Sequence, residues 1–183
     1  MNIALTGSHG VGKTTLGKNL YQYYSSRKNV FLSEGIPRKI IERGYPLGQS
    51  ATIASYTEYM IDQLAALDQA DQYDIYISDR TLLDPYAYAL TNLQVNASLV
   101  PEKEIELLYQ VWNLERKKYD LYLYLPIQFS MESDGVRPIG EEYRKLVAQT
   151  MLDLLKKYNL NYITLYGSPQ EMLYQAVNHI KKL

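Results

Sequence analysis

The sequence predicts an α/β domain in which helices cover both faces of a five-stranded parallel sheet. Two observations lead to this fold class: five short apolar segments alternate with segments of helical periodicity, and a glycine-rich loop joins the first strand to the first helix. Strands that alternate with helices pair in parallel, and ligands then collect at the carboxyl ends of the strands. We therefore expect a binding site at that edge of the sheet.

The predicted elements begin at the second residue of the chain. The expected strands cover residues 2–6, 29–33, 73–78, 119–125 and 161–166. Apolar residues at helical spacing, and the stretch after the glycine-rich loop, predict helices at 13–26, 53–67, 86–90, 105–112, 143–155 and 169–180. The last helix has the clearest beginning, because Ser168 can cap it, Pro169 suits its first position, and Glu171 lies three residues after the cap.

Length and composition indicate a single domain, residues 1–183. Hydrophobic residues make up 46% of the chain, and we find no linker, repeat or low-complexity segment. A net charge of −1 gives no global basic field for nucleic acid or an anionic membrane. The absence of cysteine excludes a disulfide scaffold and a thiolate metal site. We find no long apolar run and no secretory leader, and we therefore expect a cytoplasmic protein without a membrane partner. The 19 tyrosines, against 2 phenylalanines, indicate a core and a rim built from amphipathic rings.

The glycine-rich loop is the strongest motif in the sequence. Residues 7–14 fit the pattern G-x-x-x-x-G-K-[ST] between a predicted strand and a predicted helix, which is typical of a phosphate-binding loop. Lys13 would reach the outer phosphates, Thr14 would bind Mg²⁺ through its hydroxyl, and backbone N–H groups would converge on phosphate oxygens. His9 is expected to line the loop, a catalytic role being the alternative. The expected nucleotide-binding residues of this loop are Gly7, Ser8, His9, Gly10, Val11, Gly12, Lys13, Thr14 and Thr15.

The residues at the end of the third predicted strand distinguish a phosphotransferase from a nucleotide hydrolase. This strand ends in Asp79-Arg80, whereas a motor ATPase commonly ends it in Asp-Glu, whose glutamate polarises water. Arg80 places a cation where phosphoryl charge would be stabilised, which favours transfer. No N-K-x-D sequence occurs, which weighs against a GTPase and for ATP. The alternative for Asp79 and Arg80 is a strand-end cap and a surface ion pair.

Several segments together carry a family resemblance. "IALTGSHGVGKTTL", "SDRTLLDPYAYAL", "YLPI" with "DGVRPIGEEYR", and "GSP" before the last helix resemble the P-loop nucleoside and nucleotide kinases. These are small AAA-type kinases, related to nicotinamide riboside kinase domains, thymidylate kinases and deoxynucleoside kinases, many of them in bacteriophages. The resemblance implies a three-layer P-loop NTPase fold of strand order 2-3-1-4-5 with Mg-ATP as donor. It also implies a substrate pocket between the second strand, the Asp-Arg strand end and the following helices.

The resemblance also suggests roles for individual residues. Asp79 matches the acidic group that positions the acceptor hydroxyl or the metal, and Arg80 matches the arginine that holds phosphate. Glu34 and Arg38 stand where these kinases place a substrate-binding acid and arginine. The family pattern is E-x-x-R, but "EGIPR" has one extra residue and a proline, and a proline disfavours helix immediately ahead of it. A solvated loop pair is therefore the alternative for Glu34 and Arg38.

Three further sites complete the prediction. Asp84 either contacts substrate or caps the helix that follows Pro85. The polar segment at about 127–144 suits a lid that brings Arg137 and Arg144 to the phosphates, the alternative being an exposed loop and a helix with arginine on its outer face. The loop formed by Gly167, Ser168 and Pro169 is expected to lie near the adenine of ATP.

Three functions from different classes remain open on the sequence. The first is a kinase that phosphorylates a nucleoside, a nucleoside monophosphate or a similar small hydroxyl compound. The second is a kinase that acts on a modified base or an end in DNA, although the balanced charge shows no basic groove. The third is a P-loop ATPase or switch that transfers nothing. A homodimer is also left open.

Overall fold

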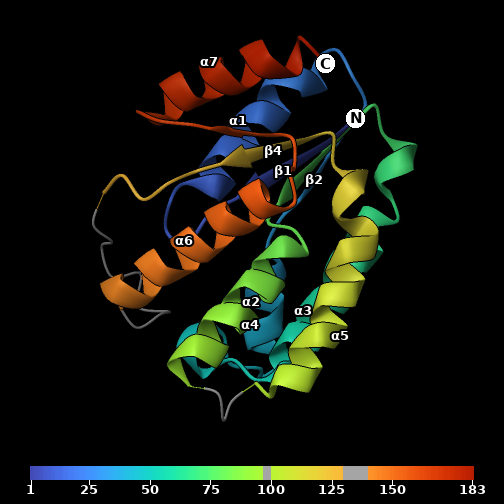
Figure 1. The fold of residues 1–183 in the computed structure, drawn as a ribbon. Coiled ribbons are helices and arrows are strands. Elements are labelled where there is room, and N and C mark those ends of the chain that lie inside the picture. The colour runs from blue at the N-terminus through green and yellow to red at the C-terminus, as the bar shows by residue number, and fades with distance from the viewer. Residues whose placement is uncertain (97–99, 130–139) are drawn as a thin grey trace.

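The computed structural model describes residues 1–96, 100–129 and 140–183. Its five strands pair in parallel in the order β2-β3-β1-β4-β5, which confirms the predicted fold class and strand order (Figure 1). The strands are β1 (Asn2–Thr6), β2 (Val30–Ser33), β3 (Ile75–Asp79), β4 (Leu121–Tyr124) and β5 (Tyr162–Thr164). The central strand, β1, leads directly into the glycine-rich loop.

Seven α-helices lie among the described residues, in two layers around the sheet. In Figure 1, α1 and α7 lie together on one face of the sheet, and α3, α4, α5 and α6 lie on the other. The helices are α1 (Lys13–Ser25), α2 (Ile36–Glu42), α3 (Ile53–Leu67), α4 (Leu83–Val95), α5 (Glu102–Glu115), α6 (Glu141–Lys157) and α7 (Pro169–Ile180). Short 3₁₀ turns occur at η1 (Gly48–Ser50), η2 (Ala70–Gln72) and η3 (Arg116–Lys118).

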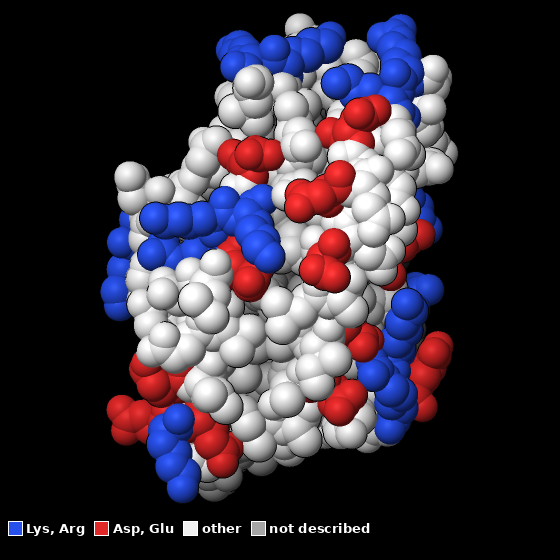
Figure 2. Space-filling model, turned by 90° about the vertical axis from the view of Figure 1, so that its right-hand side faces the viewer, with Lys and Arg blue, Asp and Glu red and all other residues white. Residues whose placement is uncertain are grey.

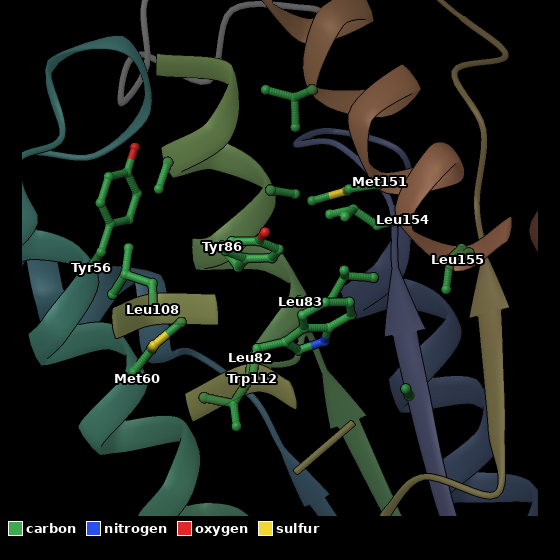
Figure 3. Close-up of a cluster of buried hydrophobic side chains, with 14 of the residues drawn as sticks. Tyr56, Met60, Leu82, Leu83, Tyr86, Leu108, Trp112, Met151, Leu154 and Leu155 are labelled. Atoms are coloured by element: carbon green, nitrogen blue, oxygen red, sulfur yellow. The ribbon is translucent and has the colours of Figure 1, made fainter. Parts of the chain in front are cut away.

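The two faces of the sheet have different chemistry, because successive strand residues point to opposite faces. The face under α1 and α7 is aliphatic and carries Ile3, Leu5, Ile75, Ile77, Leu121 and Leu123. The opposite face carries Tyr76, Tyr122 and Tyr124, and it packs against a large core that includes Trp112 and Tyr86. Figure 3 shows this core, in which the Trp112 and Tyr86 rings stack with their centroids 5.0 Å apart.

Hydrogen bonds explain how so many tyrosines fit inside the molecule. The Tyr122 hydroxyl donates to the carbonyl oxygen of Arg116 at 2.9 Å, and the Tyr124 hydroxyl donates to that of Ala148 at 3.0 Å. A buried hydroxyl is costly unless it has such a partner. Tyr122 and Tyr124 therefore serve as core residues, with the ring buried and the hydroxyl bonded to a backbone carbonyl oxygen.

The structure corrects the expectation that a proline before Arg38 disfavours helix there. Helix α2 begins at Ile36, and Pro37 lies within its first turn. Proline is tolerated at that place because the N–H groups of a first helical turn have no partner inside the helix. Helix α4 likewise begins at Leu83, three residues before the predicted run of 86–90.

The capping box predicted for the last helix is confirmed. The Ser168 hydroxyl accepts a hydrogen bond from the backbone N–H of Glu171, and the Glu171 carboxylate accepts one from the backbone N–H of Ser168. Among the residues that the structure describes, no helix is long and apolar enough to cross a membrane.

Candidate active site

The glycine-rich loop runs from the end of β1 to the start of α1 and depends on glycine for its shape. Gly7, Gly10 and Gly12 have φ angles of 141°, 70° and 94°, which side chains other than glycine rarely adopt. A Cβ atom on Gly7 would lie 2.4 Å from the carbonyl oxygen of Leu125. The glycines therefore let the loop close tightly against the segment that follows β4.

Lys13 folds back over this loop. Its Nζ donates hydrogen bonds to the carbonyl oxygens of Gly7 at 2.7 Å and Ser8 at 2.5 Å, and its side chain is buried. Helix α1 begins here without a side-chain cap on its N-terminus, which carries the positive end of the helix dipole. Val11 is buried in the aliphatic core, so that only its backbone faces the loop, while Thr15 is exposed on α1.

Thr14 and Asp79, the two predicted metal ligands, lie together. The Thr14 hydroxyl donates to Oδ2 of Asp79 at 2.5 Å. The other carboxylate oxygen, Oδ1, is buried, and the described residues offer it no hydrogen-bond partner; the same holds for the Ser8 hydroxyl in the loop. Buried polar atoms are normally satisfied, so these orphans mark a place where a ligand would bind.

Arg80 follows Asp79 in a left-handed conformation with φ of 87°. Its carbonyl oxygen accepts hydrogen bonds from Nε2 of Gln63 at 2.5 Å and from the Ser78 hydroxyl at 2.6 Å, and these bonds hold the backbone in place. The guanidinium donates to Oδ1 of Asp84 at 3.0 Å. Only 8% of Arg80 is exposed, so the alternative of a surface ion pair is wrong.

Asp84 is not the cap that was expected for the following helix, because Leu82 occupies the N-cap position of α4 and no side chain caps it. It lies in the first turn of α4, where its Oδ2 accepts the backbone N–H of Thr81 at 2.9 Å, while its Oδ1 accepts the Arg80 guanidinium. Burial raises the pKa of the Asp84 carboxyl, against the opposing effect of the Arg80 and Lys13 charges. Asp84 therefore both holds the beginning of α4 and orients Arg80.

Arg144 lies inside the molecule, and only 1% of it is exposed. Its guanidinium donates to the carbonyl oxygens of His9 at 3.0 Å, Gly10 at 3.2 Å and Phe129 at 3.0 Å. The expectation of an arginine on the outer face of the helix is therefore wrong, and Arg144 braces the glycine-rich loop. Arg137 and residues 130–139 of the predicted lid lie outside the described residues.

Glu34 and Arg38 are not drawn into the site. Both are exposed, and Glu34 forms an ion pair of 3.5 Å with Lys18 rather than with Arg38. Exposed side chains were the alternative for Glu34 and Arg38, but the basic partner of Glu34 is Lys18 and not Arg38. Solvent screening makes such an exposed pair worth little.

A cavity of about 670 Å³ opens between the glycine-rich loop, β3, α2, α3 and α4. Its wall includes His9 of the loop and both Arg80 and Asp84. Most of the other lining residues are tyrosines or belong to the segment 44–50, and the tyrosines are Tyr45, Tyr56, Tyr59, Tyr88 and Tyr143. No signal in the sequence marks these residues as functional, because tyrosines at helical spacing are typical of a core.

A buried asparagine fixes one wall of this cavity. Nδ2 of Asn92 donates to the Tyr56 hydroxyl at 2.8 Å and to the carbonyl oxygen of Gly48 at 3.0 Å, and the Tyr143 hydroxyl donates to Oδ1 of Asn92 at 2.7 Å. Asn92 thus joins α3, α4, α6 and the turn η1. Tyr143 is next to Arg144 in the chain, so α6 links this wall to the glycine-rich loop.

The loop predicted to lie near adenine follows β5. Gly167 has a φ of 95°, and its N–H donates to Oε1 of Gln128 at 2.6 Å. Ser168 and Pro169 begin α7, and Met172 in the first turns of α7 approaches Gly12 of the glycine-rich loop. The structure therefore places this exposed loop beside the phosphate-binding loop.

Comparison with known sequences identifies one family. Residues 2–171 match a family described as an AAA domain. A comparison with curated protein sequences gave no match.

Comparison with solved structures gives many matches, of which three follow. Deoxyadenosine kinase from M. mycoides with dCMP and dCDP bound has a TM-score of 0.74 and 18% identity, with 100% of both chains covered. NadR protein in complex with NR has a TM-score of 0.78 and 20% identity over 100% of this chain and 52% of the NadR chain. Thymidylate kinase from Candida albicans has a TM-score of 0.69 and 18% identity over 99% and 91% of the two chains. These likenesses confirm the predicted resemblance at the level of the fold.

Proposed function

We propose, from the premise that this chain belongs to the AAA domain family, that it is an ATP-dependent kinase acting on a nucleoside or a similar small hydroxyl compound. One observation carries the proposal: the phosphate-binding loop and the Thr14–Asp79 pair are joined, through His9 and Arg80, to a cavity lined by tyrosines. The donor would bind at the loop, and the acceptor would bind in the cavity. His9 and Arg80 lie at the boundary between the two.

Each residue of this site has a task in the proposed transfer. The backbone N–H groups of the loop bind the phosphates of ATP, and Lys13 exchanges the carbonyls of Gly7 and Ser8 for the outer phosphates. Asp79 orients the acceptor hydroxyl and accepts its proton. Arg80 stabilises the charge on the phosphoryl group in transit.

Mg²⁺ fits the oxygen atoms of Thr14 and Asp79. Mg²⁺ prefers oxygen ligands, uses one or two carboxylates, and takes further ligands from water and phosphate. When bound, the ion neutralises charge on the phosphates. Thr14 and Asp79 would hold it beside the loop.

The cavity favours an uncharged acceptor with a flat ring. Its volume of about 670 Å³ and its tyrosine rings suit a nucleoside base, which is flat and largely apolar on its faces. Within the described residues, Arg80 is the one arginine or lysine of the cavity wall, and it is already paired with Asp84. An acceptor that brings its own phosphate would therefore lack a free cation, which favours a nucleoside over a nucleoside monophosphate.

The face of the molecule that carries α5 gives no support to the alternative of a DNA-borne acceptor. Figure 2 shows basic and acidic side chains interspersed over the face that carries α5, without a continuous basic stripe on that face. Binding to nucleic acid draws most of its strength from clustered lysine and arginine. We therefore include DNA in the test below as a competing outcome.

The test is a screen with ATP labelled at the γ-phosphate. The acceptors are nucleosides, nucleoside monophosphates, nicotinamide riboside, and DNA with and without hydroxymethylated bases. We expect labelled product with one or more nucleosides, and no product with Lys13→Ala, whose fold should be intact because this side chain faces the loop. Label that appears only in DNA, or only as free phosphate, would contradict the proposal.

A further inference from the structure

The tyrosines of the cavity differ in how their hydroxyls are satisfied. Those of Tyr56 and Tyr143 are bonded to Asn92, and that of Tyr88 lies 3.1 Å from Nδ1 of His9. The Tyr59 hydroxyl is buried, and none of the described residues gives it a hydrogen-bond partner. Tyr59 therefore differs from these three tyrosines of the cavity wall.

The surroundings of Tyr59 fix its position. Its ring packs in a small apolar cluster with Ile36 and Ile40 of α2, and only 5% of the residue is exposed. Arg80 and Asp84 are close enough to act on the charge of the hydroxyl, and burial raises its pKa well above the ordinary value. The hydroxyl therefore stays protonated, and its residue lines the cavity together with Arg80.

Two other buried tyrosines are Tyr24, whose hydroxyl also lacks a partner in the described part of the chain, and Tyr119, whose hydroxyl interacts with that of Ser78. Neither residue lines the cavity. Burying a hydroxyl without a partner costs free energy, and the cost is recovered only where a ligand can supply the missing bond. Among these three residues, Tyr59 alone stands where a ligand could do so.

We propose that the Tyr59 hydroxyl forms a hydrogen bond with a polar group of the acceptor and so helps to determine which molecule the cavity accepts. This inference rests on the proposed function, because it assumes that the cavity holds the acceptor. The ligand class is an uncharged nucleoside or a similar compound, whose oxygen or nitrogen atom lies beside Arg80. Tyr59 acts on recognition, and the transfer itself stays with Asp79 and Arg80.

The experiment compares Tyr59→Phe with Tyr56→Phe in the full chain. Binding of adenosine, thymidine, cytidine and nicotinamide riboside is measured by calorimetry, together with ATP affinity and the ligand-free melting temperature. We expect Tyr59→Phe to weaken binding of the preferred nucleoside about tenfold, with ATP affinity unchanged. Its melting temperature should equal or exceed that of the parent, because the unpaired hydroxyl is gone. Tyr56→Phe should instead melt about 2–4 °C lower, because Asn92 loses a partner.

The outcomes separate this inference from the proposed function. If Tyr59→Phe binds the preferred nucleoside as tightly as the parent, or if the parent binds none of the four, the inference is overturned. A lower melting temperature with unchanged nucleoside binding would show a purely structural role. If the parent binds a nucleoside without phosphorylating it, the proposed function fails. A tenfold loss in Tyr59→Phe would then still support the recognition role.

Discussion

Arg80 adopts a left-handed backbone conformation at the carboxyl end of β3, where a non-glycine residue pays about 1–3 kcal/mol. The hydrogen bonds from Gln63 and Ser78 to its carbonyl oxygen hold it there. The turn directs the guanidinium into the cavity, where Asp84 fixes it. Strained residues of this kind cluster at active and binding sites, where the surrounding structure enforces the strain. The conformation of Arg80, next to Asp79, therefore agrees with a binding role.

Asp79→Asn should lower the rate of transfer about a hundredfold or more, while ATP binding weakens far less. Asparagine keeps an oxygen that can accept the Thr14 hydroxyl, so the fold should be retained, but the charge and the basicity are lost. Single-turnover transfer and ATP calorimetry would measure the two effects.

Asp74→Asn is the matched control for Asp79, because Asp74 lies just before β3, at the opposite end of the same strand. Its carboxylate accepts the backbone N–H of Asn29 and is remote from the cavity. This variant should transfer at the parent rate. Transfer by Asp79→Asn within about threefold of the parent would remove Asp79 as the general base, since a base contributes far more than that.

Arg144→Met should weaken both the fold and ATP binding. Methionine retains much of the bulk but leaves the carbonyl oxygens of His9, Gly10 and Phe129 without this donor. We expect a loss of about 3 kcal/mol, or roughly 6–12 °C in melting temperature, and a KM for ATP that rises more than the KM for the acceptor. Lys145→Met, at the exposed neighbouring position, should change neither. An unchanged KM for ATP in Arg144→Met would exclude the bracing role.

At the scale of elements, α6 connects the two halves of the site. Tyr143 and Arg144 are consecutive residues in its first turn, and they bind Asn92 of α4 and the glycine-rich loop respectively. A shift of α6 would therefore reach the cavity wall and the phosphate-binding loop together.

The glycine-rich loop can be tested as an element by comparing Gly7→Ala with Gly44→Ala. Both glycines have positive φ angles, but a Cβ on Gly44 meets nothing within 4 Å, whereas one on Gly7 meets the Leu125 carbonyl. Gly44→Ala should cost about 1–2 kcal/mol, the penalty of the left-handed conformation. Gly7→Ala should cost more than this and should abolish ATP binding. Denaturant unfolding and ATP calorimetry give both readings, and equal losses of stability in the two variants would contradict the close approach.

At the scale of the whole molecule, tyrosine replaces phenylalanine as the aromatic core residue. Burial raises the pKa of Tyr86 and Tyr124 to about 12, so the folded state favours their neutral forms. The stability that these two neutral hydroxyls contribute is fully present below the ordinary tyrosine pKa of about 10, and it is lost as the pH rises from about 10 to 12. The melting temperature should therefore fall steeply across this range.

Absorbance at 295 nm during an alkaline titration would test this expectation. Part of the tyrosinate signal should appear only as the fold is lost, and it should appear at lower pH in urea. A complete titration of all tyrosines at about pH 10 with the fold intact would contradict the burial of these hydroxyls.

The assignment of residues 1–183 to one domain stays a prediction. A single cooperative transition in the same melts would support it.

The sequence by itself determined the features that depend on neighbours in the chain. The glycine-rich loop, the alternation of strands and helices, the Asp-Arg strand end and the capping box of α7 are all set within a few residues, where backbone geometry and periodicity act directly. Strand order followed from family resemblance to the same local motifs. These features sufficed to predict the fold class and the phosphate-binding side of the site.

Only the tertiary structure decided the acceptor side. Arg144 reaches the carbonyl of Gly10 across 134 positions in the chain, and the tyrosines of the cavity come from α3, α4 and α6 and from the segment 44–50. No local pattern distinguishes Tyr59, which lines the cavity and whose hydroxyl has no partner among the described residues, from Tyr122, whose hydroxyl donates to a carbonyl oxygen. The difference depends on which helices pack against each ring, and packing between distant segments is fixed by shape and burial rather than by spacing in the sequence.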